Sequence, residues 1–194
     1  MRLRAAIFDL DGTIVETSYD WPRIKADLGT GSVPILSYLN GLSEPEKSRK
    51  WKVLRRYEDE ATRGAVLKEG IPDFLEFLAE KRIKKALVTN NSRKNVKTIL
   101  RKFHLRFDLV LSRECGLWKP SGAPFTKVIE ELRLNPTECF VVGDSLYDVR
   151  AARDAGIERI FILHEDGEKA PPLPAETFST VAALRARIDE LLLI

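Results

Sequence analysis

The sequence of 194 residues contains only two cysteines, two histidines and one methionine, and it contains no glutamine. Cys115 and Cys139 lie far apart, which argues against both a disulfide framework and a Cys-x-x-Cys metal site. No run approaches the roughly 18 apolar residues of a membrane helix, and acidic residues interrupt the first apolar stretch too early for a signal peptide. We therefore expect a cytoplasmic protein with reduced thiols and no membrane partner.

The charge is nearly balanced, with 32 basic and 29 acidic residues and a formal net charge of +3. Such a small excess does not by itself indicate binding to nucleic acid. Six basic residues do cluster between Lys47 and Arg56. On a helix, however, Arg55 would face Asp59 and Arg56 would face Glu60, so a solvated helix face is favoured over an anion-binding surface. We expect no nucleic-acid partner.

Short β-rich runs alternate with amphipathic patterns of helical period in the second half of the chain. Alternation of this kind is typical of right-handed crossovers between parallel strands, with helices on both faces of the sheet. The sequence therefore predicts an α/β fold, a Rossmann-like three-layer core around a parallel sheet. The predicted strands lie within residues 4–11, 84–91, 107–114, 139–145 and 159–165, and the predicted helices within 92–105, 123–134, 147–156 and 180–194.

The interval from Thr17 to Gly70 carries no strand signal. A short helix is predicted over Pro22 to Leu28, and a longer one begins at a Ser43/Glu46 capping box and ends near Gly64. We therefore divide the chain into a core, residues 1–16 and 71–194, and a helical insert, residues 17–70. The proline-rich stretch 169–178 is predicted to be a surface connection.

Polar residues follow the predicted strands at the point where each one ends. Because the carboxyl ends of parallel strands meet at one edge of the sheet, these side chains should converge there. The set contains carboxylates, a hydroxyl, amides and a lysine. Its members are Asp9, Asp11, Thr89, Asn90, Lys119, Asp144 and Asp148.

This set suits a phosphate group together with a hard cation. Mg²⁺ prefers oxygen ligands, which Asp9 and Asp144 could supply. Clustered carboxylates would otherwise repel each other and titrate at raised pKa values. One aspartate could attack phosphorus, and a second could move protons to and from the leaving oxygen.

Four of these segments resemble, in order and spacing, the motifs of the haloacid dehalogenase superfamily in its phosphoglycolate-phosphatase-like branch. They are DLDGT at 9–13, VTNN at 88–91, KPSGAPF at 119–125 and GDSLYD at 143–148. The resemblance implies a Mg²⁺-dependent phosphatase that acts on a small phosphorylated metabolite through an aspartyl-phosphate intermediate. It also implies that the insert is a small α-helical cap over the site.

The resemblance assigns a role to each motif residue. Asp9 would be the nucleophile and Asp11 the general acid and base. Thr89 and the backbone amide of Asn90 would bind the phosphoryl group, and Lys119 would balance its charge. Members that cleave carbon–halogen bonds lack the second aspartate, so the presence of Asp11 favours phosphoryl transfer.

The resemblance also implies a metal site. Asp9 and Asp144 would ligate Mg²⁺, Asp11 would contribute its backbone oxygen, and Asp148 would hold the ion directly or through water. The plainer alternatives are a strand-ending turn at the Asp11-Gly12 pair and a helix cap at Asp148.

Two other functions use the same residues. A phosphotransferase or sugar-phosphate mutase would exclude water and transfer the phosphoryl group to a second hydroxyl. A non-catalytic module would bind a phosphorylated ligand without turnover. In each case specificity would come from insert residues that face the site, for which Trp21, Arg23, Lys25, Lys52 and Arg56 are the candidates.

Overall fold

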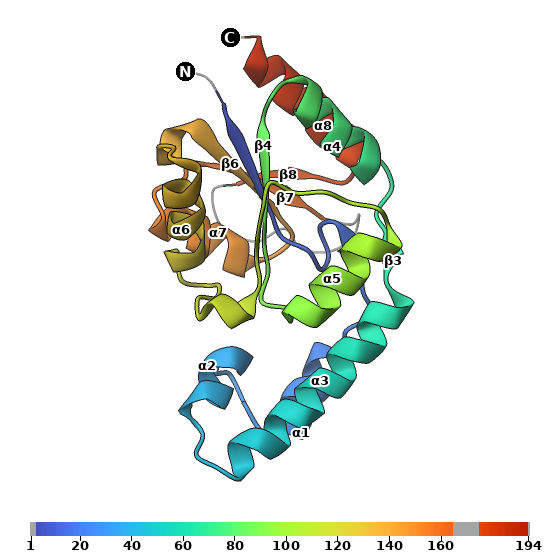
Figure 1. Cartoon of the computed structure of the whole chain (residues 1–194), viewed down its shortest axis with the longest axis vertical. Coiled ribbons are helices and arrows are strands. Elements are labelled where there is room, and N and C mark those ends of the chain that lie inside the picture. Colours follow the sequence, from blue (N-terminus) through green and yellow to red (C-terminus); the bar gives the residue numbers. More distant parts are fainter. Residues whose placement is uncertain (1–2, 165–174, 194) are drawn as a thin grey trace.

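The computed structural model describes residues 3–164 and 175–193. Its centre is a parallel sheet of six strands in the order β5-β4-β1-β6-β7-β8 (Figure 1). The strands are β1 (Ala5–Phe8), β4 (Lys84–Val88), β5 (Leu109–Leu111), β6 (Cys139–Gly143), β7 (Arg159–Leu163) and β8 (Glu176–Phe178). The first strand of the chain therefore lies inside the sheet, between β4 and β6.

Helices cover both faces of this sheet, which confirms the predicted three-layer α/β fold. On one face α4 (Ile71–Glu80), α5 (Arg93–Lys102) and α8 (Val181–Leu192) pack around Phe8, and on the other α6 (Ala123–Leu132) and α7 (Leu146–Asp154) pack around Ile7. All four residues of β1 are fully buried. Its continuous apolar sequence is what a strand covered on both faces requires.

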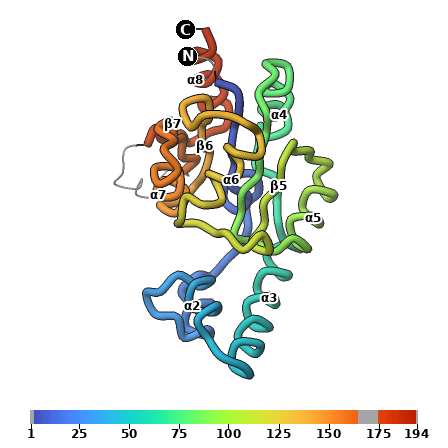
Figure 2. The backbone as a smooth tube through the Cα atoms, turned by 60° about the vertical axis from the view of Figure 1, so that its left-hand side comes forward, coloured from blue at the N-terminus to red at the C-terminus, as the bar shows by residue number. Residues whose placement is uncertain are grey.

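Three helices of the insert lie beyond the carboxyl ends of the strands (Figures 1 and 2). They are α1 (Trp21–Leu28), α2 (Ile35–Gly41) and α3 (Glu46–Gly64), and they bury a cluster of their own. The helix predicted over Pro22 to Leu28 is confirmed, whereas α2 was not predicted. The cluster consists of Ile24, Leu28, Leu36, Leu39 and Leu54.

The predicted Ser43/Glu46 capping box is wrong. Helix α3 begins at Glu46, so Pro45 occupies the N-cap position, and no side chain there accepts a capping hydrogen bond. Instead Glu44 Oε2 accepts a hydrogen bond from the backbone N–H of Ser48 at 3.2 Å. A carboxylate just outside the helix therefore satisfies one of the free N–H groups of its first turn.

The two chain segments that join the insert to the core lie side by side. Strand β2 (Val15–Glu16) pairs antiparallel with β3 (Val66–Leu67), a strand that was not predicted. This pair holds the entry and exit of the insert together.

The predicted surface connection at 169–178 lies only partly within the described residues. Its last residues, Glu176–Phe178, form the edge strand β8, so a strand stands where a connection was predicted. The predicted final helix is confirmed as α8. Within the described ranges, no helix combines the length and the hydropathy that crossing a membrane requires.

Candidate active site

The turn after β1 sets the position of the first two aspartates. Gly12 has φ +80°, and its N–H donates to Val15 O at 2.7 Å. A Cβ atom on Gly12 would lie 2.2 Å from Asp144 Oδ2. Glycine is therefore needed both for the turn and for the close approach of the loop after β6.

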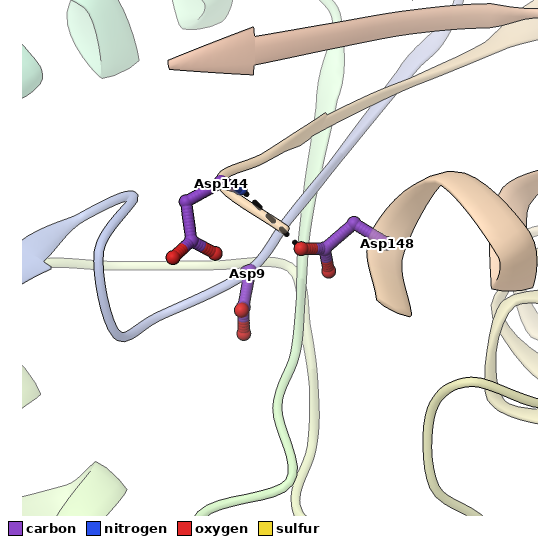
Figure 3. Close-up of side chains that lie close together, drawn as sticks. All are labelled: Asp9, Asp144 and Asp148. Atoms are coloured by element: carbon purple, nitrogen blue, oxygen red, sulfur yellow. Dashed lines mark hydrogen bonds between the residues drawn. The ribbon is translucent and has the colours of Figure 1, made fainter. Parts of the chain in front are cut away.

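Three carboxylates meet at the ends of β1 and β6. Asp9, Asp144 and Asp148 each place an oxygen within 4.8 Å of the others, and Figure 3 shows the three side chains converging. Asp9 follows β1, Asp144 follows β6, and Asp148 lies in the first turn of α7. The pairing of β1 with β6 brings them together, as expected for residues that follow neighbouring parallel strands.

Lys119 is buried among these carboxylates. Its Nζ lies 2.7 Å from Asp9 Oδ1 and 2.6 Å from Asp148 Oδ1. Asn90 fixes the lysine backbone, because its Nδ2 donates to Lys119 O and its Oδ1 accepts from Lys119 N, both at 2.9 Å. Burial alone would lower the pKa of Lys119, but the charges of Asp148 and Asp9 outweigh it and raise that pKa. The lysine is held as a cation.

Both oxygens of Asp148 are occupied. Oδ1 accepts from Lys119, and Oδ2 accepts from the N–H groups of Asp144 and Ser145 and from Ser145 Oγ at 2.7 Å. Asp148 thus caps α7, as the plainer alternative predicted, and also binds Lys119. A Cβ atom on Gly143 would lie 2.4 Å from Asp148 Cγ, so the strand end is shaped around this side chain.

The negative charge exceeds what Lys119 neutralises. Burial raises the pKa of Asp9 to about 7 in spite of the nearby lysine. Burial, together with the charges of Asp9 and Asp148, also raises the pKa of Asp144 well above its usual value. Within the described residues, the Asp144 carboxylate accepts no hydrogen bond. Three carboxylates thus surround a single cation, Lys119, and their oxygens suit a divalent ion such as Mg²⁺. Asp9 and Asp144 are the available ligands.

Asp11 is held by Asn91, a residue of the VTNN segment for which no role was predicted. Asn91 Nδ2 donates to Asp11 Oδ2 at 3.1 Å and lies 3.2 Å from the hydroxyl oxygen of Tyr19. Asp11 Oδ1 is buried without a partner among the described residues. Burial raises the pKa of Asp11 above its usual value, which favours the protonated form that a general acid needs.

Thr89 and Ser92 stand at the start of α5. The Thr89 side chain is buried, and its Oγ1 accepts a hydrogen bond from Asn91 N at 3.0 Å. Because a hydroxyl both accepts and donates, its proton remains available to an anion. Ser92 Oγ accepts from Asn95 N at 3.2 Å and caps the helix.

Side chains of α3 reach across to the core beside this site. Glu58 forms a buried, two-pronged ion pair with Arg113, which follows β5, and the Arg113 guanidinium lies over the ring of Trp51 at 4.8 Å. Asp59 binds Lys94 of α5 at 2.6 Å. The expected pairing of Arg55 with Asp59 is therefore wrong, since the carboxylate turns to the core. Arg56 lies over the Tyr57 ring and does not pair with Glu60.

A cavity of about 640 Å³ opens between the insert and the core. None of the five insert residues considered from the sequence as specificity candidates lines it. Its lining residues are Leu36, Asn40, Trp51, Arg55, Asp59, Ser92, Lys94, Arg113, Glu114, Gly116 and Trp118. The helical spacing of Trp51 and Leu54 was a signal for Trp51, whereas Arg55 was expected to pair with Asp59 on a solvated helix face. Which residues of α3 face the core depends on tertiary contacts.

The carboxylate cluster and the buried lysine lie at the carboxyl edge of a parallel α/β sheet, where proteins of this architecture bind their ligands. Residues 22–162 match the family described as haloacid dehalogenase-like hydrolase, and the chain belongs to that family. It is a hydrolase, and its family includes phosphatases.

Relatives and solved structures agree with this assignment. The chain is 30% identical over 184 residues to the phosphorylated carbohydrates phosphatase of Thermotoga maritima, covering 82% of this chain and 84% of the relative. It is 26% identical over 191 residues to the phosphoglycolate phosphatase of Chromobacterium violaceum, covering 82% and 85%. A hydrolase of the superfamily from Ehrlichia chaffeensis has the same fold, with a TM-score of 0.69, 23% identity and 99% coverage of both chains.

Proposed function

We propose that the protein is a Mg²⁺-dependent phosphatase that hydrolyses a small phosphomonoester metabolite through an aspartyl-phosphate on Asp9. The observation that carries the proposal is the buried contact of Lys119 with Asp9 and Asp148 beside the free carboxylate of Asp144. This arrangement supplies a nucleophile, a fixed cation and ligands for a second cation at one strand edge. Phosphoryl transfer depends mainly on such positioning and charge stabilisation.

In this mechanism an Asp9 oxygen attacks phosphorus and the bond to the leaving oxygen breaks, while Asp11 gives that oxygen its proton. Asp11 then takes a proton from water, whose oxygen attacks the phosphorus of the aspartyl-phosphate and releases inorganic phosphate. Asp9 and protonated Asp11 are thereby regenerated. The raised pKa of Asp11 supports its starting the cycle as an acid.

Charge on the phosphoryl group would be balanced by Lys119 and by hydrogen bonds from Thr89 and the backbone N–H of Asn90. Asp9 and Asp144, with the backbone oxygen of Asp11, would hold Mg²⁺, which neutralises phosphate charge when bound. Asp148 would act on the ion only indirectly, because both of its oxygens are already hydrogen-bonded.

We further propose that residues 17–70 form a cap over the site and that the protein is cytoplasmic. The separate apolar cluster of α1–α3 and the paired linkers β2 and β3 support the first. The two free cysteines support the second. The relatives' names, phosphorylated carbohydrates and phosphoglycolate phosphatase, support a small phosphorylated metabolite as substrate.

The test is phosphate release from a broad phosphomonoester panel with and without Mg²⁺. Asp9→Asn should abolish turnover and leave the circular dichroism spectrum unchanged, while Asp108→Asn, a surface carboxylate outside the site, should keep full activity. If the Asp9→Asn protein still turns over, Asp9 is not the nucleophile. Phosphoryl transfer to added sugar that exceeds transfer to water would indicate a phosphotransferase, and binding without any turnover would indicate the non-catalytic module.

A further inference from the structure

Two residues that line the cavity between the insert and the core are direct neighbours in the chain of residues at the reaction centre. Ser92 on its wall directly follows Asn91, which holds Asp11, and Trp118 directly precedes Lys119. A group that leaves from phosphorus beside Asp9 and Asp11 would therefore extend toward this space.

Its size does not match the smallest phosphomonoesters. The cavity measures about 640 Å³, whereas a leaving group of five non-hydrogen atoms would fill on the order of 100 Å³, judging by roughly 30 Å³ for a water molecule. Pockets of about 300–1,000 Å³ are the size that buries most of a drug-sized ligand. Trp51, Trp118 and Leu36 supply apolar surface on which the face of a ring can pack.

All but one of the charged side chains that line the cavity have an ion-pair or hydrogen-bond partner in the described part of the chain. Asp59 is bound to Lys94, and Arg113 is bound to Glu58. Glu114 accepts hydrogen bonds from Arg93 N and Ser112 Oγ, both at 2.8 Å. In the part of the chain that the structure describes, Arg55 makes no hydrogen bond, ion pair or ring contact.

The unpaired state of Arg55 has a structural cause. Its natural helical partner is Asp59, one turn further along α3, but the Asp59 carboxylate lies against Lys94 on α5. The guanidinium, with five donors in a planar fork, is thus left at a cavity that already has aromatic walls. Such a group binds carboxylate or phosphate oxygens in pairs.

We propose that this cavity selects phosphomonoesters whose leaving group contains a ring and a second anionic group, with Trp51 and Trp118 packing on the ring and Arg55 binding the anion. The proposal rests on the phosphatase function above and adds the substrate class. Lys94 does not take this role, since its ammonium group is already paired.

Three probes separate the effect of the second charge from that of the ring. N-acetylglucosamine 6-phosphate and N-acetylmuramic acid 6-phosphate share ring and phosphate, but only the latter has a carboxylate, while 2-phosphoglycolate has a carboxylate without a ring. The wild-type protein should prefer N-acetylmuramic acid 6-phosphate about tenfold in kcat/KM over either of the others, as expected for one charge-assisted hydrogen-bonded pair. Arg55→Gln should remove the preference over the amino sugar through KM, leaving kcat unchanged.

Arg56→Gln is the matched control, because Arg56 is adjacent in sequence but lies over Tyr57 and does not line the cavity. It should keep the preference, and Arg55→Lys should keep part of it. Equal kcat/KM values for the two amino sugars in the wild-type protein, or a preference that survives in Arg55→Gln, would overturn the proposal while the phosphatase function stands.

A binding measurement makes the test independent of turnover. Calorimetry in the Asp9→Asn background compares the same two amino-sugar phosphates with and without Arg55→Gln. A tenfold difference in Kd that disappears with Arg55→Gln supports the cavity's role even if no hydrolysis is found. No hydrolysis across the panel would overturn the proposed function alone, and equal Kd values would overturn the selectivity.

Discussion

Glu58 of α3 and Arg113 of the short 3-10 helix Arg113–Cys115 form an ion pair across the boundary between insert and core, and each side chain is only 7% exposed. Because a guanidinium cannot lose its proton, Glu58→Gln would leave a buried, unpaired cation. We expect this change to lower the free energy of unfolding by about 3 kcal/mol in urea titration.

The neighbouring pair of Asp59 and Lys94 provides the control. It bridges the same two parts, but Lys94 is 72% exposed, so Lys94→Met should change the free energy of unfolding by less than about 1 kcal/mol. The double variant Glu58→Leu/Arg113→Met should recover much of the loss, because it removes both charges. Equal effects of Glu58→Gln and Lys94→Met would show that the buried pair contributes no more to stability than the exposed pair.

Replacing Lys119 tests the charge balance of the carboxylate cluster. Lys119→Met removes the cation between Asp9 and Asp148, so these buried carboxylates repel each other without compensation. We expect phosphatase activity to fall by at least about 100-fold and the melting temperature to fall at neutral pH. Lys127→Met, which removes an exposed lysine paired with Glu131, should change neither.

Much of this site was predictable because its residues follow uninterrupted apolar strands. Asp9 and Asp144 end buried strands that pair with each other, and the parallel alternation of strand and helix determines that such ends meet. The contacts that were missed depend on tertiary packing. Asp59 has a local partner in Arg55 by helical spacing, yet it binds Lys94, a residue 35 positions away. The seven residues of α2 were also missed, because a helix so short leaves little periodicity.

The raised pKa of Asp9 should make the stability of the metal-free protein depend on pH. Its folded value is about 7, raised by burial from a usual value of 3.8. Between these two values the folded state binds more protons than the unfolded state, so the metal-free protein should lose stability as pH rises from about 4 to about 7. The raised pKa of Asp144 acts in the same direction.

Added Mg²⁺ must displace those protons, so its stabilising effect should grow with pH. We expect the Mg²⁺-induced rise in melting temperature to be several degrees at about pH 7.5 and near zero at about pH 5. Asp144→Asn should abolish the rise, while Asp108→Asn should not alter it. A rise that is independent of pH, or that persists in Asp144→Asn, would show that the ion binds elsewhere.

Asn91 positions Asp11, and its removal should impair proton transfer in particular. Asn91→Ala deletes the donor 3.1 Å from Asp11 Oδ2, so the acid loses a contact that fixes its orientation. An alkyl phosphate needs its leaving oxygen protonated, whereas p-nitrophenolate leaves without a proton. We therefore expect kcat for an alkyl phosphate to fall about 10- to 100-fold, and kcat for p-nitrophenyl phosphate to fall less than about threefold. Tyr19→Phe removes the hydroxyl that lies 3.2 Å from Asn91 Nδ2 and should give a weaker form of the same pattern. Equal losses on both substrates would mean that Asn91 supports the fold of the site rather than the orientation of its acid.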